Sequence, residues 1–127
     1  MRISLDTNRY TDFQRGNTVV RQVLEAAMEI CVPFATVDEL RAGFAGGSRG
    51  AENEKWFQLF LSRPGVRVLY PDDGTTRQYA TLYQQLKAQG TPVPTNDIWI
   101  AALTLQHGVT LYSRDAHFDH IPQLPRV

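Results

Sequence analysis

Short apolar runs alternate with longer segments of helical periodicity along most of the chain. One of these apolar runs, at residues 32–35, contains Pro33. Because proline has no N–H to donate, Pro33 should lie among the first residues of that strand or at a sheet edge. Strands that alternate with helices are typical of an α/β sandwich with a mostly parallel sheet. The runs with the length of buried strands lie near residues 2–5, 32–35, 66–70 and 109–112.

Apolar residues at helical spacing predict helices between these strands. The segment 18–31 carries them at i, i+3, i+4, i+7 and i+11, which is one face of a helix. Thr36-Val-Asp-Glu39 has the S/T-x-x-E spacing of a capping box, which predicts a helix that opens at Thr36. A nearly all-apolar helix should begin at Thr95 or Asn96 and lie at the centre of the fold. The other predicted helices span residues 9–15, 52–62 and 75–89.

Acidic residues stand where the predicted strands end or where the predicted helices begin. Asp6 follows the first strand, and Asp115 follows the last. Glu39 lies one turn into the helix after the second strand, although a capping box alone would explain it. Asp97 lies in the first turn of the apolar helix, where the helix dipole also favours an acid. Because the carboxyl ends of parallel strands share one edge of a sheet, we expect these four acids to converge.

Carboxylates gathered in one crevice would repel one another and raise one another's pKa values, and a divalent cation removes that cost. Mg²⁺ and Mn²⁺ prefer oxygen ligands, so the acids predict one of these ions as the cofactor. Carboxylate-held Mg²⁺ activates water and neutralises the charge of a phosphate, which favours phosphodiester cleavage. The sequence has no Walker motif and no G-x-G-x-x-G. The histidines lack the spacing of a zinc site; they are His107, His117 and His120.

The charge balance supports a polyanionic substrate only when the four acids are set aside. Lys and Arg number 13, and Asp and Glu also number 13. If four acids bind metal, nine remain against thirteen bases. Arg9, Arg41 and Arg114 flank the acids in sequence, so we expect them to contact the phosphates of such a substrate, which suit the guanidinium fork.

Length and cysteine content bound the class of protein. A chain of 127 residues is expected to form one domain over residues 1–127. Cys31 is the single cysteine, so no internal disulfide forms and a reducing compartment is expected. No signal peptide and no run of apolar residues long enough to span a membrane are present, which predicts a cytoplasmic protein without membrane partners.

Short motifs follow one another in an order that is specific in a chain of this length. They are D-T-N at Asp6–Asn8, Glu39 within Val37–Arg41, N-D-x-x-I-A-A at Asn96–Ala102, and S-R-D at Ser113–Asp115 shortly before Phe118. In order and spacing they resemble the PIN-domain family over essentially the whole chain, and most closely its VapC-type toxin ribonucleases. The resemblance implies a three-layer α/β/α sandwich with strand order 3-2-1-4-5. Its fifth strand is expected at residues 123–127.

The same resemblance implies a function and a set of site residues. The function is metal-dependent endoribonuclease activity with Mg²⁺ or Mn²⁺, as the toxin of a VapBC-like pair acting on tRNA or another structured RNA. The implied partners are a VapB-like antitoxin and a second copy of the chain in a homodimer. His117 stands where many relatives have Asp or Asn, and Asp119 is not a clean replacement. By motif, the catalytic and metal-binding acids are Asp6, Glu39, Asp97 and Asp115, and the supporting residues are Asn8 and Ser113.

Two other functions stay open at this point. A haloacid-dehalogenase-like phosphatase needs an acid two residues after the first, and Asn8 occupies that position. A non-catalytic PIN module that binds RNA or protein typically lacks some of the acids, whereas this chain keeps all four. Hydrolysis of a small phosphomonoester would indicate the phosphatase. Absence of RNA cleavage with metal present would indicate the binding module.

Overall fold

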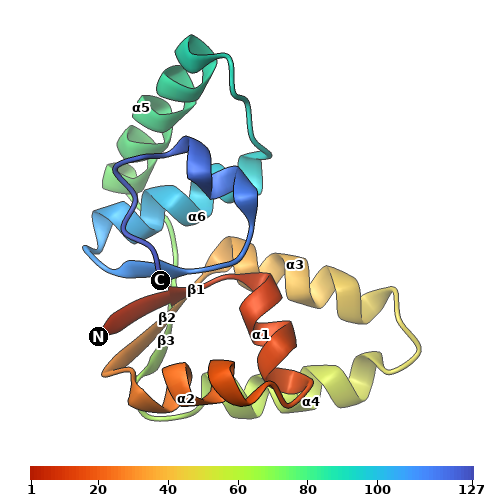
Figure 1. Ribbon diagram of the computed structural model, residues 1–127. Helices are drawn as coiled ribbons and strands as arrows, with labels where there is room; N and C mark the ends of the chain where they lie inside the picture. Colours follow the sequence, from red (N-terminus) through yellow and green to blue (C-terminus); the bar gives the residue numbers. More distant parts are fainter.

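The computed structural model describes residues 1–127 and has a parallel four-stranded sheet at its centre (Figure 1). The strand order is β3-β2-β1-β4, and every neighbouring pair is parallel. All four carboxyl ends therefore meet at one edge of the sheet, as the acid pattern requires. The strands are β1 (Arg2–Leu5), β2 (Glu29–Pro33), β3 (Val66–Leu69) and β4 (Thr110–Tyr112).

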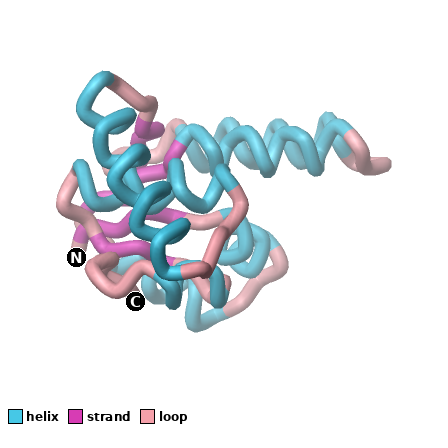
Figure 2. The backbone as a smooth tube through the Cα atoms, turned by 90° about the horizontal axis from the view of Figure 1, so that it is seen from above, coloured by secondary structure: helices cyan, strands magenta, loops and turns pink.

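Helices cover both faces of the sheet, which confirms the predicted three-layer sandwich. In Figure 1, α5 and α6 lie on one side of the sheet and α1, α2 and α4 on the other. Ile3 and Leu5 of β1 pack toward the second group, whereas Leu111 of β4 packs toward the first. The hairpin of α3 and α4 projects past the carboxyl edge of the sheet (Figures 1 and 2). The helices are α1 (Thr7–Gln14), α2 (Thr18–Ala26), α3 (Phe34–Ala45), α4 (Gly50–Leu61), α5 (Asp73–Gln89) and α6 (Thr95–Gln106).

The predicted helix over residues 18–31 is wrong in its last third. The helix ends at Ala26, and the following strand begins at Glu29, earlier than the predicted strand at residues 32–35. Cys31 is fully buried in that strand, opposite Ser4 of β1. Backbone pairing with β1 and β3 outweighs the helical spacing of the side chains, because β2 lies between two strands. Pro33 ends the strand and does not begin it.

Prolines precede two helices, α3 and α6, in place of the side-chain caps that the sequence signals predict. Pro33 precedes α3 and Pro94 precedes α6, and neither helix has a side-chain cap. The capping box predicted at Thr36 is therefore wrong. Thr36 is fully buried in the first turn of α3, and its hydroxyl donates to the Leu5 carbonyl at 3.0 Å. This bond joins α3 to the end of β1, and the Glu39 side chain is left without a capping role.

The C-terminal segment lies beside β4, in the place predicted for a fifth strand, but forms only one bridge. Arg126 pairs in parallel with Leu111, whose N–H donates to the Pro125 carbonyl at 2.8 Å. Before it, a 3-10 helix, η1 (Ala116–His120), follows the loop after β4. None of the helices has both the length and the apolar content needed to cross a membrane.

Candidate active site

The four predicted acids come from four different elements at the carboxyl edge of the sheet. Asp6 follows β1 and Asp115 follows β4, while Glu39 belongs to α3 and Asp97 to the first turn of α6. The Asp6 N–H donates to the Tyr112 carbonyl at 3.2 Å, so the two strand ends are tied together beside the acids. The structure thus brings all four acids to one region.

Asp6 is almost completely buried and is held by three donors. Its carboxylate accepts from the Thr7 N–H at 2.8 Å, from the Ser113 hydroxyl at 2.6 Å and from the Asn8 amide at 3.4 Å. Burial raises the pKa of Asp6 above 3.8, the hydrogen bonds of Ser113 and Thr7 lower it, and the charges of Glu39 and Asp115 raise it. Asp6 therefore carries a charge that the surrounding protein compensates only in part.

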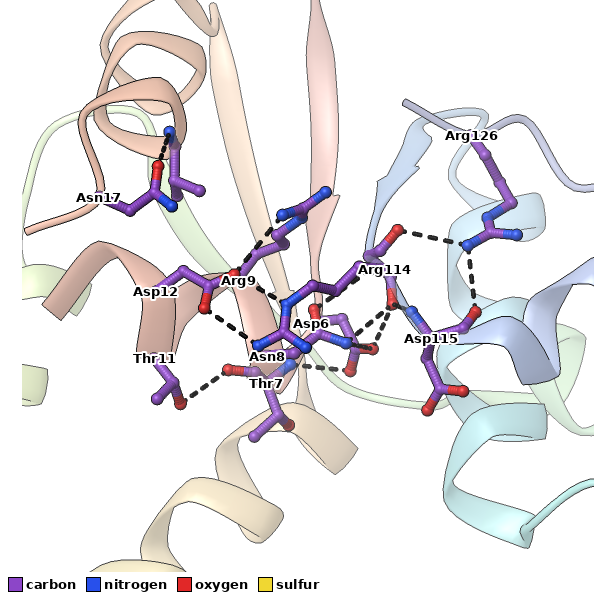
Figure 3. A network of polar contacts seen from close by, with 12 residues as sticks. Asp6, Thr7, Asn8, Arg9, Thr11, Asp12, Asn17, Arg114, Asp115 and Arg126 are labelled. Carbon is purple, nitrogen blue, oxygen red and sulfur yellow. Dashed lines mark hydrogen bonds and ion pairs between the residues drawn. The ribbon is translucent and has the colours of Figure 1, made fainter. Parts of the chain in front are cut away.

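Ser113 and Asn8 connect Asp6 to the loop after β4, and Figure 3 shows Asn8 beside Asp6. The Ser113 oxygen accepts from the Asn8 amide at 3.3 Å and from the Asp115 N–H at 3.1 Å. Arg126 holds the same loop from the C-terminal side, because it donates to the carbonyls of Ser113 and Asp115 at 3.3 and 3.1 Å. Both residues that the sequence predicted as supporting thus contact the first acid.

Glu39 links α1, α3 and α6 through its two oxygens. One accepts from the Thr7 hydroxyl at 2.8 Å, and the other accepts from the Asn96 amide at 3.2 Å. Asn96 therefore does not cap α6; it donates across to the neighbouring helix. Glu39 is part of the acid cluster, since its charge raises the pKa of Asp6.

Asp97 and Asp115 meet at a third side chain, His117, which the sequence reasoning set aside. The Nδ1 atom of His117 lies 2.8 Å from Asp97 Oδ2 and 3.3 Å from Asp115 Oδ1. Burial raises the pKa of Asp97 to about 6, the His117 hydrogen bond lowers it, and the charges of Asp115 and Asp6 raise it. An imidazole therefore joins the acids, although the spacing of the histidines gives no zinc pattern. The sequence carries one signal for this contact, because His117 stands only two residues after Asp115, the last acid.

The arginines predicted to contact phosphate are each paired with an acid. Arg114 makes two contacts of 3.0 Å with Asp12, and its side chain is 54% exposed beside the site (Figure 3). Arg9 lies 4.6 Å from the centre of the Tyr112 ring and 3.5 Å from Asp12. Arg41 forms a forked pair with Glu54 at 2.9 and 3.2 Å.

The side chains present fit a divalent cation. Asp6 and Asp97 are buried acids with raised pKa values. A bound cation would offset the free-energy cost of burying their charges and would reduce their mutual repulsion. Donor atoms of Asp97, Asp115 and His117 all lie within 4.8 Å of one another. Asp119 does not join them; it pairs with Arg126. The cluster can hold a metal ion and present it to a substrate phosphate.

Comparison with known proteins gives a consistent result. The family model described as PIN domain matches residues 3–124, a span that includes all four acids. The chain is 36% identical over 121 residues to plasmid stability protein StbB of Pseudomonas syringae pv. tomato, covering 89% of this chain and 87% of that protein. It is 30% identical over 96 residues to ribonuclease VapC1 of Haemophilus influenzae strain R2866, covering 75% and 70%. Its fold resembles DNA-bound VapBC from Salmonella typhimurium, with a TM-score of 0.90 and 22% identity over 100% of this chain and 97% of that one.

We predict that Asp97→Asn stabilises the metal-free protein at pH 8 by about 1–2 kcal/mol, since it removes a charge whose pKa is raised to about 6. A raised carboxyl pKa costs stability above the folded value, and that cost fades as the pH falls through 6 toward 3.8. Urea unfolding in EDTA at pH 8 and pH 5 should show the gain shrinking. Asp38→Asn, an exposed acid on α3, is the control and should change little.

An equal gain at both pH values, or a loss at pH 8, would contradict the assignment of a strained charge to Asp97. A loss at pH 8 would mean that the hydrogen bond with His117 contributes more to stability than burial of the carboxylate costs.

Proposed function

Because the chain belongs to the PIN-domain family, we propose that it is an endoribonuclease that hydrolyses RNA phosphodiester bonds with a bound Mg²⁺ or Mn²⁺. The convergence of four acids from four elements at one sheet edge carries this proposal. We assign the metal-binding and catalytic roles to those acids over a single domain spanning residues 1–127. They are Asp6, Glu39, Asp97 and Asp115.

Each acid has a distinct part in the proposed mechanism. Asp97 and Asp115 would hold the ion, and Asp6, which follows β1, would add a third carboxylate to the site. When bound, the ion supplies an activated water and neutralises charge on the phosphate and the leaving oxygen. Glu39 is fixed by Thr7 and Asn96, so its carboxylate can orient a water beside Asp6.

Ser113 and Asn8 act as positioning residues in this proposal. They hold the Asp6 carboxylate through hydrogen bonds of 2.6 and 3.4 Å, and Ser113 also accepts from the Asp115 N–H. Their contacts keep the acids of β1 and β4 together before any substrate binds. Such preorganisation lowers the reorganisation needed during the reaction.

We propose that the chain is the toxin of a VapBC-like pair, with a VapB-like antitoxin as partner and a homodimer as its assembly. The likeness to ribonuclease VapC1 and to the structure of VapBC supports this role. Structured RNA, with tRNA as the first candidate, is the proposed substrate. Unstacked bases in single-stranded loops offer the edges that proteins read in RNA.

Cleavage of a total tRNA pool tests the proposal. We predict discrete fragments with Mn²⁺ or Mg²⁺, none with EDTA, and a rate lowered about 10²-fold or more in Asp6→Asn, the scale of losing one preorganised electrostatic group. Asp38→Asn, which has the same net charge as Asp6→Asn, should cleave normally, because Asp38 is exposed and makes none of the contacts of the acid cluster.

Wild-type cleavage by Asp6→Asn would refute the assignment of the acids. Failure of a folded, metal-bound protein to cleave any RNA would favour the non-catalytic PIN module. Turnover of a small phosphomonoester would favour the phosphatase, although Asn8 donates to Asp6 and Ser113 in place of the acid which that enzyme needs.

Arg114 is the proposed phosphate contact that the structure favours, because it is half exposed and lies between Ser113 and Asp115. Replacing it with alanine should weaken RNA binding and lower the slope of log affinity against log salt by about one. Arg77→Ala on α5 is the control, since Arg77 pairs with Asp73 on a helix away from the acids. Equal salt slopes for both variants would reject Arg114, and the same measurement on Arg9 and Arg41 would rank the remaining two.

A further inference from the structure

His117 brings a nitrogen donor into a site that is otherwise built from carboxylates. It lies in η1, whose first turn Asp115 caps by accepting from the His117 N–H at 2.9 Å. The backbone contact and the ring contact thus involve the same carboxylate. His107 lies at the opposite end of α6 from Asp97. Of the three histidines, His117 is the one grouped with the acids.

One ring nitrogen of His117 faces both carboxylates. Adjacent ligands of an octahedral ion with bonds of 2.0–2.1 Å are separated by about 2.9 Å. The observed separations from Nδ1 are 2.8 Å to Asp97 and 3.3 Å to Asp115, on either side of that value. Both distances from Nδ1 are therefore those expected between adjacent ligands of one ion.

The same distances would also suit a protonated His117 that pairs with both carboxylates and competes with a metal ion. An imidazolium supplies one positive charge, whereas four carboxylates share this region. A divalent ion supplies two positive charges and leaves the ring nitrogen lone pair free to bind it. The two roles of His117 predict opposite effects of removing the ring, so binding measurements separate them.

We infer that His117 Nδ1 is a ligand of the ion held by Asp97 and Asp115, and that this nitrogen makes the site prefer Mn²⁺ to Mg²⁺. The inference rests on the proposed metal-dependent function of the same acids. Imidazole suits transition-metal ions, whereas Mg²⁺ favours oxygen ligands and retains several waters. His117 thus sets which ion the site selects.

Metal binding by the full chain, measured without RNA, tests this inference. The protein is stripped with EDTA, dialysed and titrated with Mn²⁺ while the free-ion electron paramagnetic resonance signal is followed. Mg²⁺ affinity comes from competition. We expect His117→Ala to weaken Mn²⁺ binding about tenfold or more. We expect His117→Asp to lower the preference for Mn²⁺ over Mg²⁺ by a similar factor while keeping a ligand at this position.

Electron spin-echo spectra of bound Mn²⁺ give a direct readout of the nitrogen ligand. Wild type and the control His120→Ala should show ¹⁴N modulation, because His120 lies in the same η1 helix but outside the cluster. His117→Asp should not show it, and its bound Mn²⁺ would itself demonstrate a folded site.

Three outcomes would overturn the inference. They are wild type that binds no Mn²⁺, bound Mn²⁺ without nitrogen modulation, and Mn²⁺ affinity that is unchanged or raised in His117→Ala, as a competing imidazolium predicts. Failure of the proposed function looks different. Nitrogen-coupled Mn²⁺ without RNA cleavage would refute the ribonuclease and keep His117 as a ligand. Metal-dependent cleavage without nitrogen coupling would support the ribonuclease and refute His117 as a ligand.

Discussion

Burial of carboxylates at one edge of the sheet is the constraint on which the rest of this structure depends. Asp6 and Asp97 are 4% and 7% exposed, and burial raises both pKa values. The hydrogen bonds that Asp6 receives from Thr7 and Ser113 offset part of the cost. The part that remains favours binding of a cation, so the electrostatic cost of these acids and their proposed chemistry have the same origin.

The backbone leaves Glu39 and Asp97 without capping roles, whereas Asp6 accepts from the Thr7 N–H and Asp115 caps η1. Parallel strands bring Asp6 and Asp115 to one edge, while Pro33 and Pro94 begin α3 and α6 without a side-chain cap. A capping side chain would be turned back onto its own helix. Without that role, Glu39 accepts from Asn96 of the neighbouring helix. Helix starts and strand ends thus act together to build one surface.

Most of the fold could be predicted from the sequence, because strand-then-acid positions and apolar spacing are local signals of a parallel sheet. The signals failed where tertiary contacts decide. Residues 29–31 continue a helical pattern but lie in a strand between two others, and Thr36 has capping spacing but donates to the Leu5 carbonyl. His117 was missed because the histidines were compared with one another for zinc spacing, whereas its partners are Asp97 and Asp115, which only the fold brings together.

Anomalous diffraction from crystals soaked in Mn²⁺ would test the central claim, that this edge of the sheet is a metal centre, most directly. The account predicts an anomalous peak among the side-chain donors of Asp97, Asp115 and His117, on the side of the cluster that faces Asp6. Crystals in which these side chains are ordered, and keep their present hydrogen bonds at saturating Mn²⁺ with no peak between them, would contradict it.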